Sequence, residues 1–375
     1  MGRILSFSTG CLAVACLALP ALVFGAAVKD VLDRPALKVV NPVHAVLVDV
    51  TRAGSRLVAV GERGVVIFSD DAGDTWHQAD VPVSATLTAV FFPTPEQGWA
   101  VGHSGVVLHT TDGGQSWSRQ LDGVTAAHMA LETAQTAAAR LPSQDNATNQ
   151  MVHNAELLVA DGPDKPFLDL YFKNDREGVV VGAYGLIFST ADGGQSWQCL
   201  MDHAENPRAL HLYAIRAFGD NLYIAGEQGL FLVSRDKGIS YQQTQTPYSG
   251  TFFDLIVTSS GDVVIVGLRG NAFWSADQGA TFNQTRVPVE VSFSAVSHLE
   301  DGSLLFANQA GMLLASRDGG RSMQQTDIPR LAPISALIPT GNGNVMTVGY
   351  GGAMRVRLPS SGSKDKGGSS ETPNQ

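Results

Sequence analysis

Six copies of a short polar motif carry the most regularly spaced reactive side chains in this sequence. Each copy has Ser or Thr, then Asp two residues on, Gly after two more, Ser or Thr after two more, and finally an aromatic residue or Met. Carboxylates that recur in this way could hold calcium or take part in acid–base catalysis. The aspartates are Asp71, Asp112, Asp192, Asp236, Asp277 and Asp318.

A structural role explains these aspartates better than catalysis does. An Asp in a tight turn accepts hydrogen bonds from nearby backbone amides, and the Gly supplies a strained dihedral angle. The terminal aromatic ring can pack against a neighbouring blade of the fold. Because a catalytic pair would not need six equivalent copies, we interpret the six segments as ties within hairpins and call them the aspartate loops. We predict no catalytic residue, metal site or cofactor.

A second set of polar and aromatic residues lies in tight turns that follow an apolar strand. A strand-ending residue recurs at Gly61, Gly102, Gly182, Gly226, Gly267, Asn308 and Gly349. Two variable residues come next in every copy. These pairs are Glu62 and Arg63, His103 and Ser104, Ala183 and Tyr184, Glu227 and Gln228, Leu268 and Arg269, Gln309 and Ala310, and Tyr350 and Gly351.

The elements that position both sets repeat at a fixed period. Successive strand-ending residues are 41, 80, 44, 41, 41 and 41 residues apart. The longest gap equals one repeat plus an insertion, so the repeats number seven. The chain has 40 Gly residues, 44% hydrophobic residues and only 16% charged residues, which suits short strands joined by tight turns. Four antiparallel strands in each repeat predict an all-β fold, a seven-bladed β-propeller.

We expect the propeller to span residues 36–358. The seventh repeat covers residues 334–358 and ends before an outermost strand, which leaves an exposed sheet edge. The apolar segment at residues 36–41, just upstream of the first blade, is predicted to supply that strand and close the ring. The Ser-, Gly- and Lys-rich tail at residues 359–375 is expected to be disordered.

An insertion at residues 122–165, between blades 2 and 3, has helical character. Residues 125–141 are rich in Ala, and residues 147–159 place an apolar stripe after a possible cap at Asn146. We expect a helical hairpin. It could lie across the functional face, where it would gate the channel or grip a partner, or it could only pack down on the ring.

The order of strands decides which face of the ring can recognise a partner. In an antiparallel blade successive turns alternate between the two ends, so the aspartate loops and the turns with variable residues lie on opposite faces. We call the latter the turn face. The residues expected to bind a client there are Arg63, His103, Tyr184, Gln228, Arg269, Gln309 and Tyr350.

The first 27 residues read as an export signal. Arg3 precedes an apolar run over residues 4–24, and Gly25, Ala26 and Ala27 suit a signal-peptidase pocket. We predict cleavage after Ala27, or after Gly25, and export to the periplasm. The alternative is an uncleaved anchor helix, because the run is long enough to span a bilayer. Since Cys11 and Cys16 lie in this segment, Cys199 alone would remain, buried and without a disulfide partner.

Overall charge limits the class of partner. The formal net charge is −10 and the pI is about 5.3, which argues against nucleic acid or an anionic membrane surface as the main ligand. The sequence also contains no His-Glu-x-x-His motif, phosphate-binding loop or nucleophile elbow. We therefore expect a protein partner, and a monomeric propeller.

The aspartate loops resemble the Asp boxes of bacterial neuraminidase-type repeats, which makes a glycosidase one hypothesis. Sialidases use several arginines to clamp a carboxylate, a Tyr activated by a Glu, and an acidic proton donor. The turn face offers two residues of each kind. They are Arg63 and Arg269, Tyr184 and Tyr350, and Glu62 and Glu227.

The wording of the repeats favours a binding platform. Residues 98–105 read Gly-Trp-Ala-Val-Gly-His-Ser-Gly and are followed by Thr-Asp-Gly-Gly-Gln-Ser-Trp at 111–117, and residues 178–197 repeat the pattern. Over residues 43–358 the sequence resembles the photosystem II assembly and stability factors, seven-bladed propellers of the thylakoid lumen. The resemblance implies an exported, non-enzymatic scaffold that holds a membrane-protein subunit during complex assembly, in the thylakoid lumen if the organism is photosynthetic.

Overall fold

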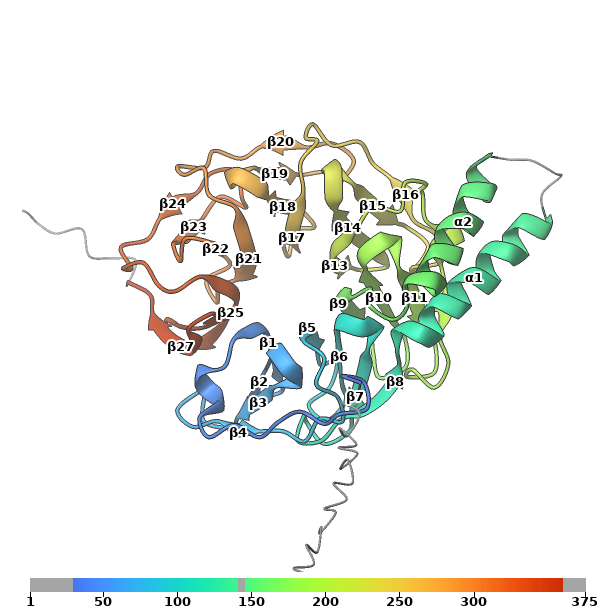
Figure 1. Cartoon of the computed structure of the whole chain (residues 1–375). Helices are drawn as coiled ribbons and strands as arrows, with labels where there is room; N and C mark the ends of the chain where they lie inside the picture. The colour runs from blue at the N-terminus through green and yellow to red at the C-terminus, as the bar shows by residue number, and fades with distance from the viewer. Residues whose placement is uncertain (1–29, 141–145, 360–375) are drawn as a thin grey trace, which may run out of the picture.

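Seven antiparallel sheets stand around a common axis, as the repeat period predicts. The structure is a computed structural model that describes residues 30–140 and 146–359. Six of the sheets have four strands each and the seventh has three. Figure 1 shows them as blades of a ring, with the first strand of each blade nearest the axis. The predicted seven-bladed propeller is confirmed, with a seventh blade one strand short.

The blades follow one another in chain order, and their strands run from the axis outward. They are β1 (Leu47–Ala53), β2 (Arg56–Gly61), β3 (Val66–Ser69) and β4 (His77–Gln78); β5 (Leu87–Phe91), β6 (Gly98–Gly102), β7 (Val107–Thr110) and β8 (Ser118–Leu121); β9 (Phe167–Phe172), β10 (Gly178–Gly182), β11 (Ile187–Thr190) and β12 (Gln198–Cys199); β13 (Leu212–Phe218), β14 (Asn221–Gly226), β15 (Phe231–Ser234) and β16 (Gln242–Gln243); β17 (Phe252–Val257), β18 (Val263–Gly267), β19 (Ala272–Ser275) and β20 (Asn283–Gln284); β21 (Phe293–His298), β22 (Leu304–Asn308), β23 (Leu313–Ser316) and β24 (Gln324–Gln325); and β25 (Ile334–Gly341), β26 (Asn344–Gly349) and β27 (Gly352–Arg357).

The hydrophobic core is divided among the interfaces between blades and does not form a single central cluster. Strand side chains alternate between the two faces of a sheet, so a strand with a neighbour on either side must be apolar on both. In β10, Val180 packs toward blade 2, whereas Val179 and Val181 pack toward blade 4. Seven hydrophobic clusters of this kind occupy the seven interfaces between adjacent blades.

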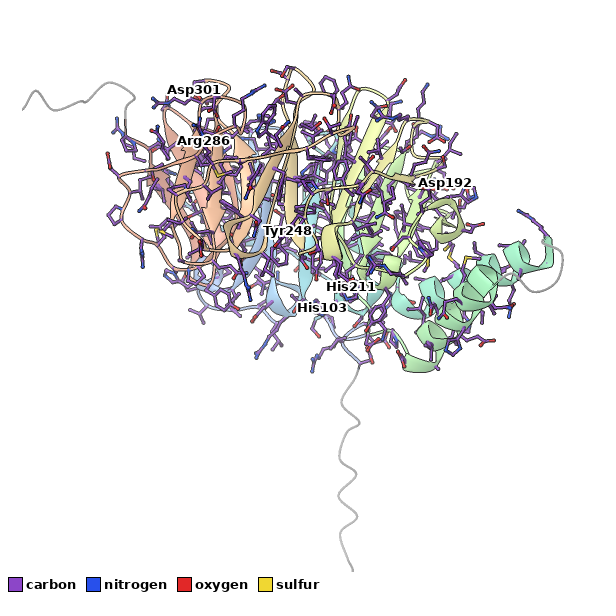
Figure 2. The ribbon with its side chains drawn as sticks, turned by 90° about the horizontal axis from the view of Figure 1, so that it is seen from above. His103, Asp192, His211, Tyr248, Arg286 and Asp301 are labelled. Atoms are coloured by element: carbon purple, nitrogen blue, oxygen red, sulfur yellow. The ribbon has the colours of Figure 1, made fainter. Side chains whose placement is uncertain are left out.

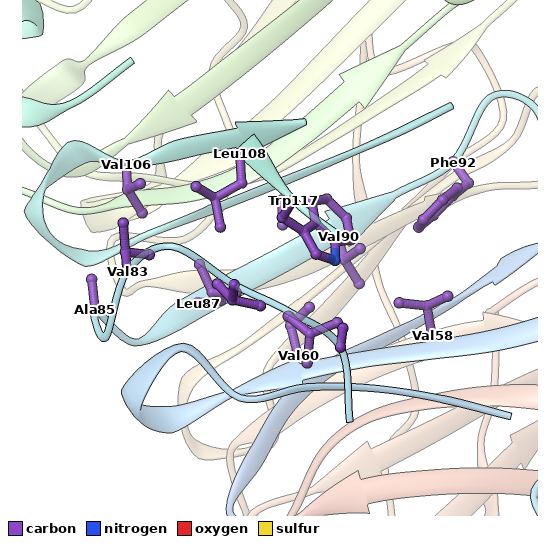
Figure 3. Packing of buried hydrophobic residues seen from close by; sticks show 14 of the residues in the cluster. Val58, Val60, Val83, Ala85, Leu87, Val90, Phe92, Val106, Leu108 and Trp117 are labelled. Atoms are coloured by element: carbon purple, nitrogen blue, oxygen red, sulfur yellow. The ribbon is translucent and has the colours of Figure 1, made fainter. Parts of the chain in front are cut away.

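The aromatic side chain at the end of an aspartate loop packs on the preceding blade. Trp117 is 7% exposed and belongs to the cluster between blades 1 and 2. Figure 3 shows its indole beside Val90 of its own blade, with Val58 and Val60 of blade 1 nearby. Its Nε1 donates to the Gly114 carbonyl at 3.1 Å, so burial leaves the indole N–H satisfied.

The prediction that residues 36–41 form the closing strand of blade 7 is wrong. Residues 36–41 form no strand, and the sheet of blade 7 ends at β27. The segment instead runs along blade 1, where the Ala36 N–H donates to the Val81 carbonyl at 3.1 Å and Lys38 Nζ donates to the Ala79 carbonyl at 2.9 Å. Ala36 packs against the cluster between blades 1 and 2, whereas Leu37 and Val40 are exposed.

Blades 7 and 1 meet by packing of their faces. Met346 and Val348 of β26 share a buried cluster with Leu57 and Ile67 of blade 1. The Arg355 guanidinium also bridges the two blades, with Nη2 2.8 Å from Asp74 Oδ1 and 2.7 Å from the Ala72 carbonyl. The ring therefore closes without a shared sheet.

The repeated Gly at the end of each second strand has a steric cause. A Cβ on Gly61 would collide with the carbonyl oxygen of Val46, and one on Gly102 with that of Thr86. Both are extended, so the need is for close approach and not for an unusual dihedral angle. In the sixth blade Asn308 fills this position, and its side-chain Oδ1 accepts hydrogen bonds from the Ala310 and Met312 amides.

The insertion forms two helices, α1 (Gly123–Arg140) and α2 (Asn146–Asp161). Asp122 Oδ1 caps α1 by accepting the Thr125 N–H at 3.0 Å, whereas Asn146, the expected cap of α2, is already helical. Ala126, Ala127 and Ala130 are buried against blades 2 and 3. Figure 1 shows both helices projecting outward from the rim of the propeller. The hypothesis that the helical hairpin gates the central channel is therefore wrong.

Two predictions lie outside the described residues. They are the signal peptide at residues 1–27 and nearly all of the tail at residues 359–375. Among the described residues no helix has the length and apolarity that crossing a bilayer requires.

Candidate functional site

The variable turns and the aspartate loops lie on opposite faces of the ring. Figure 2 shows Asp192 toward one side, and His103 and His211 toward the other, where the helices also lie. All seven residues predicted to bind a client are exposed. Tyr350 is 70% exposed and Tyr184 is 45% exposed, which is high for aromatic side chains. The turn face therefore presents side chains that the fold does not need for its core.

In five of the seven turns the residue before the Gly has a left-handed backbone. Arg63, Ser104, Tyr184, Gln228 and Arg269 have φ between 54° and 58°, and each is followed by a Gly that also has positive φ. Two such residues in succession, with a hydrogen bond across the turn, make a type I′ turn. In blade 1 that bond runs from the Val65 N–H to the Glu62 carbonyl at 3.0 Å. The Gly is obligatory, while the residue before it varies from blade to blade.

In each aspartate loop the carboxylate is held by hydrogen bonds from the same loop. In blade 3, Asp192 Oδ1 accepts the Ser196 N–H at 2.9 Å and the Thr190 hydroxyl at 2.9 Å, and Oδ2 accepts the Ser196 hydroxyl at 2.6 Å. The same bonds recur at Asp71, Asp112, Asp236, Asp277 and Asp318. Hydrogen bonds from Ser196 lower the pKa of Asp192 to about 2. A carboxylate so fully engaged by its own loop has little capacity for a ligand.

Two of the turn-face candidates for catalysis share a hollow. Tyr184 and Glu227 line one hollow of about 260 Å³, which Arg208 and His211 also line. Arg63, Arg269 and Tyr350 belong to the turns of blades 1, 5 and 7, and none of them lines this hollow. The described residues therefore bring together a Tyr and a Glu, without the expected arginines.

Sequence reasoning missed three aspartates around the axis. Asp49, Asp169 and Asp254 sit on β1, β9 and β17, the first strands of blades 1, 3 and 5. Each accepts the next residue's N–H and one N–H of the following blade, from Val90, Ile215 and Val296 respectively at 2.8, 2.8 and 2.9 Å. These carboxylates tie neighbouring blades together. The sequence signal is an Asp where the other four repeats have Ala.

One cation accompanies the three carboxylates. Arg216 of β13 contacts Asp169 and donates from Nη2 to Asp254 Oδ1 at 2.7 Å. Among the described residues Asp49 forms no ion pair, and burial raises its pKa to about 7, with a further contribution from the charge of Asp169 and a smaller opposing one from Arg216. Burial also raises the pKa of Asp254, against the opposing effect of Arg216.

Within the described part of the chain, Cys199 is buried and the possible metal ligands do not cluster. Cys199 is 4% exposed, and burial raises the pKa of its thiol to about 11, so it stays protonated at neutral pH. Across residues 30–140 and 146–359 no three His, Cys, Asp or Glu side chains gather in a way that could hold a metal ion.

Comparison with known proteins agrees with this geometry. The chain is similar to a structure described as YCF48 bound to D1 peptide, at 18% identity and a TM-score of 0.61, over 87% of this chain and 99% of that one. It is also similar to YCF48 from Cyanidioschyzon merolae, at 16% identity and a TM-score of 0.59, over 83% of this chain and 95% of that one.

More distant propellers share the fold alone. The WD40 β-propeller domain of Doa1 is similar at 11% identity and a TM-score of 0.57, over 86% of this chain and 95% of that one. No curated protein sequence matches significantly.

The family model described as photosynthesis system II assembly factor YCF48 matches residues 33–137 and 149–248, more than half of the sequence. The chain therefore belongs to the YCF48 family of photosystem II assembly factors.

Proposed function

We propose that this protein is an exported, non-enzymatic scaffold whose turn face binds a membrane-protein subunit while a membrane complex is assembled. Membership of the YCF48 assembly-factor family carries the proposal. A protein with a similar fold is described as YCF48 bound to D1 peptide, so this fold can bind a peptide. Export rests on residues 1–27, which would deliver the chain to the periplasm, or to the thylakoid lumen of a photosynthetic organism.

The contrast between the two faces supports the turn face as the binding surface. Every loop aspartate is engaged by hydroxyls and amides of its own loop, whereas the turns of blades 1, 3, 4 and 5 present exposed Arg63, Tyr184, Gln228 and Arg269 on a left-handed backbone. Rigid turns that vary only in their side chains suit recognition, because binding costs little further ordering of the backbone.

Capture of a client from membranes tests the proposal. Tagged protein spanning residues 28–375 is incubated with detergent-solubilised membranes of its own organism, and bound integral membrane proteins are identified by mass spectrometry. Reversing two turn-face charges with Arg63→Glu and Arg269→Glu should reduce recovery of the client by about tenfold or more, because both charges would be reversed at the contact.

A matched control carries the same charge change on the other face. Arg235 and Arg317 are exposed residues within aspartate loops, so Arg235→Glu with Arg317→Glu should leave recovery unchanged. Equal loss in both double variants, or no membrane protein captured by the unmodified chain, would contradict the proposal.

A glycoside hydrolase is the second candidate function. It is favoured by one observation, the shared hollow of Tyr184 and Glu227, which could pair a nucleophile with its activating carboxylate. Fluorogenic sialosides and other glycosides provide the assay. Turnover by the unmodified protein that Tyr184→Phe abolishes and Tyr350→Phe leaves intact would replace the scaffold with an enzyme; absence of turnover leaves the scaffold.

A further inference from the structure

A hollow of about 260 Å³ lies where helix α2 meets the turn face of blades 3 and 4. We call it the insertion groove and define it by Leu157, Leu158, Tyr184, Arg208, His211 and Glu227. Leu157 is 46% exposed and Tyr184 is 45% exposed, so both sides of the groove offer apolar surface to solvent. Figure 2 shows His211 on the side of the ring where the helices lie.

The groove is held in shape by polar contacts. Lys165 is only 9% exposed, and its Nζ lies 3.1 Å from Asp161 Oδ2 at the end of α2 and 5.0 Å from the centre of the Tyr184 ring. The Tyr184 N–H donates to His211 Nδ1 at 3.1 Å, and the two rings are 4.9 Å apart. The aromatic side of the groove is therefore preorganised for a ligand.

Arg208 supplies a positive charge beside this apolar surface. Its side chain is exposed, and Nη1 donates to the neutral amide of Gln228 at 2.8 Å. Within the described residues no carboxylate oxygen lies within 4.0 Å of its guanidinium nitrogens. The other charged group of the groove, Glu227, accepts the backbone N–H of His211 at 3.3 Å.

We propose that the insertion groove binds an extended segment of the client protein, in which one bulky apolar side chain, Leu or Phe, fills the hollow and a neighbouring carboxylate pairs with Arg208. This inference rests on the proposed scaffold function. The hollow is smaller than the roughly 300 to 1,000 Å³ of small-molecule sites, and suits a single side chain. An anionic membrane surface fits poorly, because the chain carries a net charge of −10.

Fluorescein-labelled decapeptides on a Gly/Ser background test the proposal by fluorescence anisotropy with the chain spanning residues 28–375. One peptide carries adjacent Phe and Asp, a second Ala and Asp, and a third Phe and Lys. The Phe–Asp peptide should bind about tenfold more tightly than the Ala–Asp peptide, since the ring is buried. It should bind up to about fivefold more tightly than the Phe–Lys peptide, as an exposed ion pair allows.

Two variants of similar exposure locate the binding. Leu157→Asp should remove the preference for Phe, whereas Val124→Asp, on α1 and 47% exposed, should preserve it. Arg208→Glu should make the Phe–Lys peptide the better ligand. Equal affinity for all three peptides, or equal effects of Leu157→Asp and Val124→Asp, would overturn the proposal. Concentration-dependent dimers abolished by Leu157→Asp would also overturn it, because a second copy would then be the occupant.

Failure of this inference is distinguishable from failure of the scaffold function. If Leu157→Asp captures the membrane client as well as the unmodified protein does, the groove is not the site and the scaffold function stands. If the peptides bind as expected but no membrane protein is captured, the groove inference retains its peptide specificity and the scaffold function fails.

Discussion

The two faces of the propeller use polar residues in opposite ways. On one face six aspartate loops repeat the same residues, and every carboxylate is engaged by hydroxyls and amides of its own loop. On the other face the turn residues change from Arg63 to Tyr184 to Gln228, and their side chains are exposed. Repetition marks what the fold requires, and variation at a fixed backbone position marks where recognition can be placed.

Removing an interblade ring on the aspartate face should have the largest effect on stability. Trp117→Ala deletes an indole that is 7% exposed between blades 1 and 2, so the free energy of unfolding should fall by about 3–5 kcal/mol. Denaturant unfolding measures the change. Trp76→Ala removes the equivalent, half-buried ring of blade 1 and should cost less. Equal losses from the two substitutions would break the link between burial and stability.

On the turn face, stability should depend on the Gly and not on the variable residue before it. Gly229 has φ of 78°, and an added Cβ would collide with the Tyr248 carbonyl oxygen. Gly229→Ala should therefore cost more than Gly162→Ala, where φ is 82° with open space around it and left-handed strain alone costs about 1 kcal/mol.

Gln228→Ala, one residue earlier, serves as the matched control and should change stability by about 0.5 kcal/mol or less. Thermal melting compares the three variants. A larger cost at Gln228 than at Gly229 would contradict the division between scaffold and recognition residues.

The repeat period made the fold predictable, but not every element within it. Strand-ending residues that recur about every 41 residues, with one gap of 80, predicted the blade count. The apolar composition of residues 36–41 suggested a strand, yet Leu37 and Val40 are exposed and hydrogen bonds to blade 1 place the segment instead. Composition alone does not say which neighbouring edge a segment will join.

The candidate site was partly predictable for the same reason. The repeat gives the positions of the turn residues, so the face on which they lie could be predicted from the sequence. The insertion groove could not, because no periodicity encodes the direction in which α2 leaves the ring. The aspartates around the axis, Asp49, Asp169 and Asp254, were not predicted either, because they occupy only three of seven equivalent positions. We call them the axial aspartates.

Smaller, pH-dependent effects should separate the axial aspartates from the aspartate loops. Burial raises the pKa of Asp49 to about 7, so the folded protein binds this proton more tightly than the unfolded chain, and stability should decline as the pH rises from 4 to 7. Asp49→Asn cannot ionise, so its melting temperature should lack this part of the decline, a difference of a few degrees.

Asp277→Asn is the opposite case. The hydrogen bond from Thr281 lowers the pKa of Asp277 to about 2, so the carboxylate stabilises the fold above pH 4 and this stabilisation is lost as the pH falls toward 2. The cost of Asp277→Asn should therefore shrink on acidification. Parallel pH profiles for the two variants would contradict the distinction between axial and loop aspartates.

Site-directed photo-crosslinking tests most directly whether the turn face holds the client. Benzoylphenylalanine replaces either Tyr350, 70% exposed on the turn face, or Ile239, 63% exposed in an aspartate loop, and each protein is irradiated with solubilised membranes. We expect an adduct with an integral membrane protein from position 350 and none from position 239. An adduct from position 239 alone would place the client on the aspartate face and contradict the account.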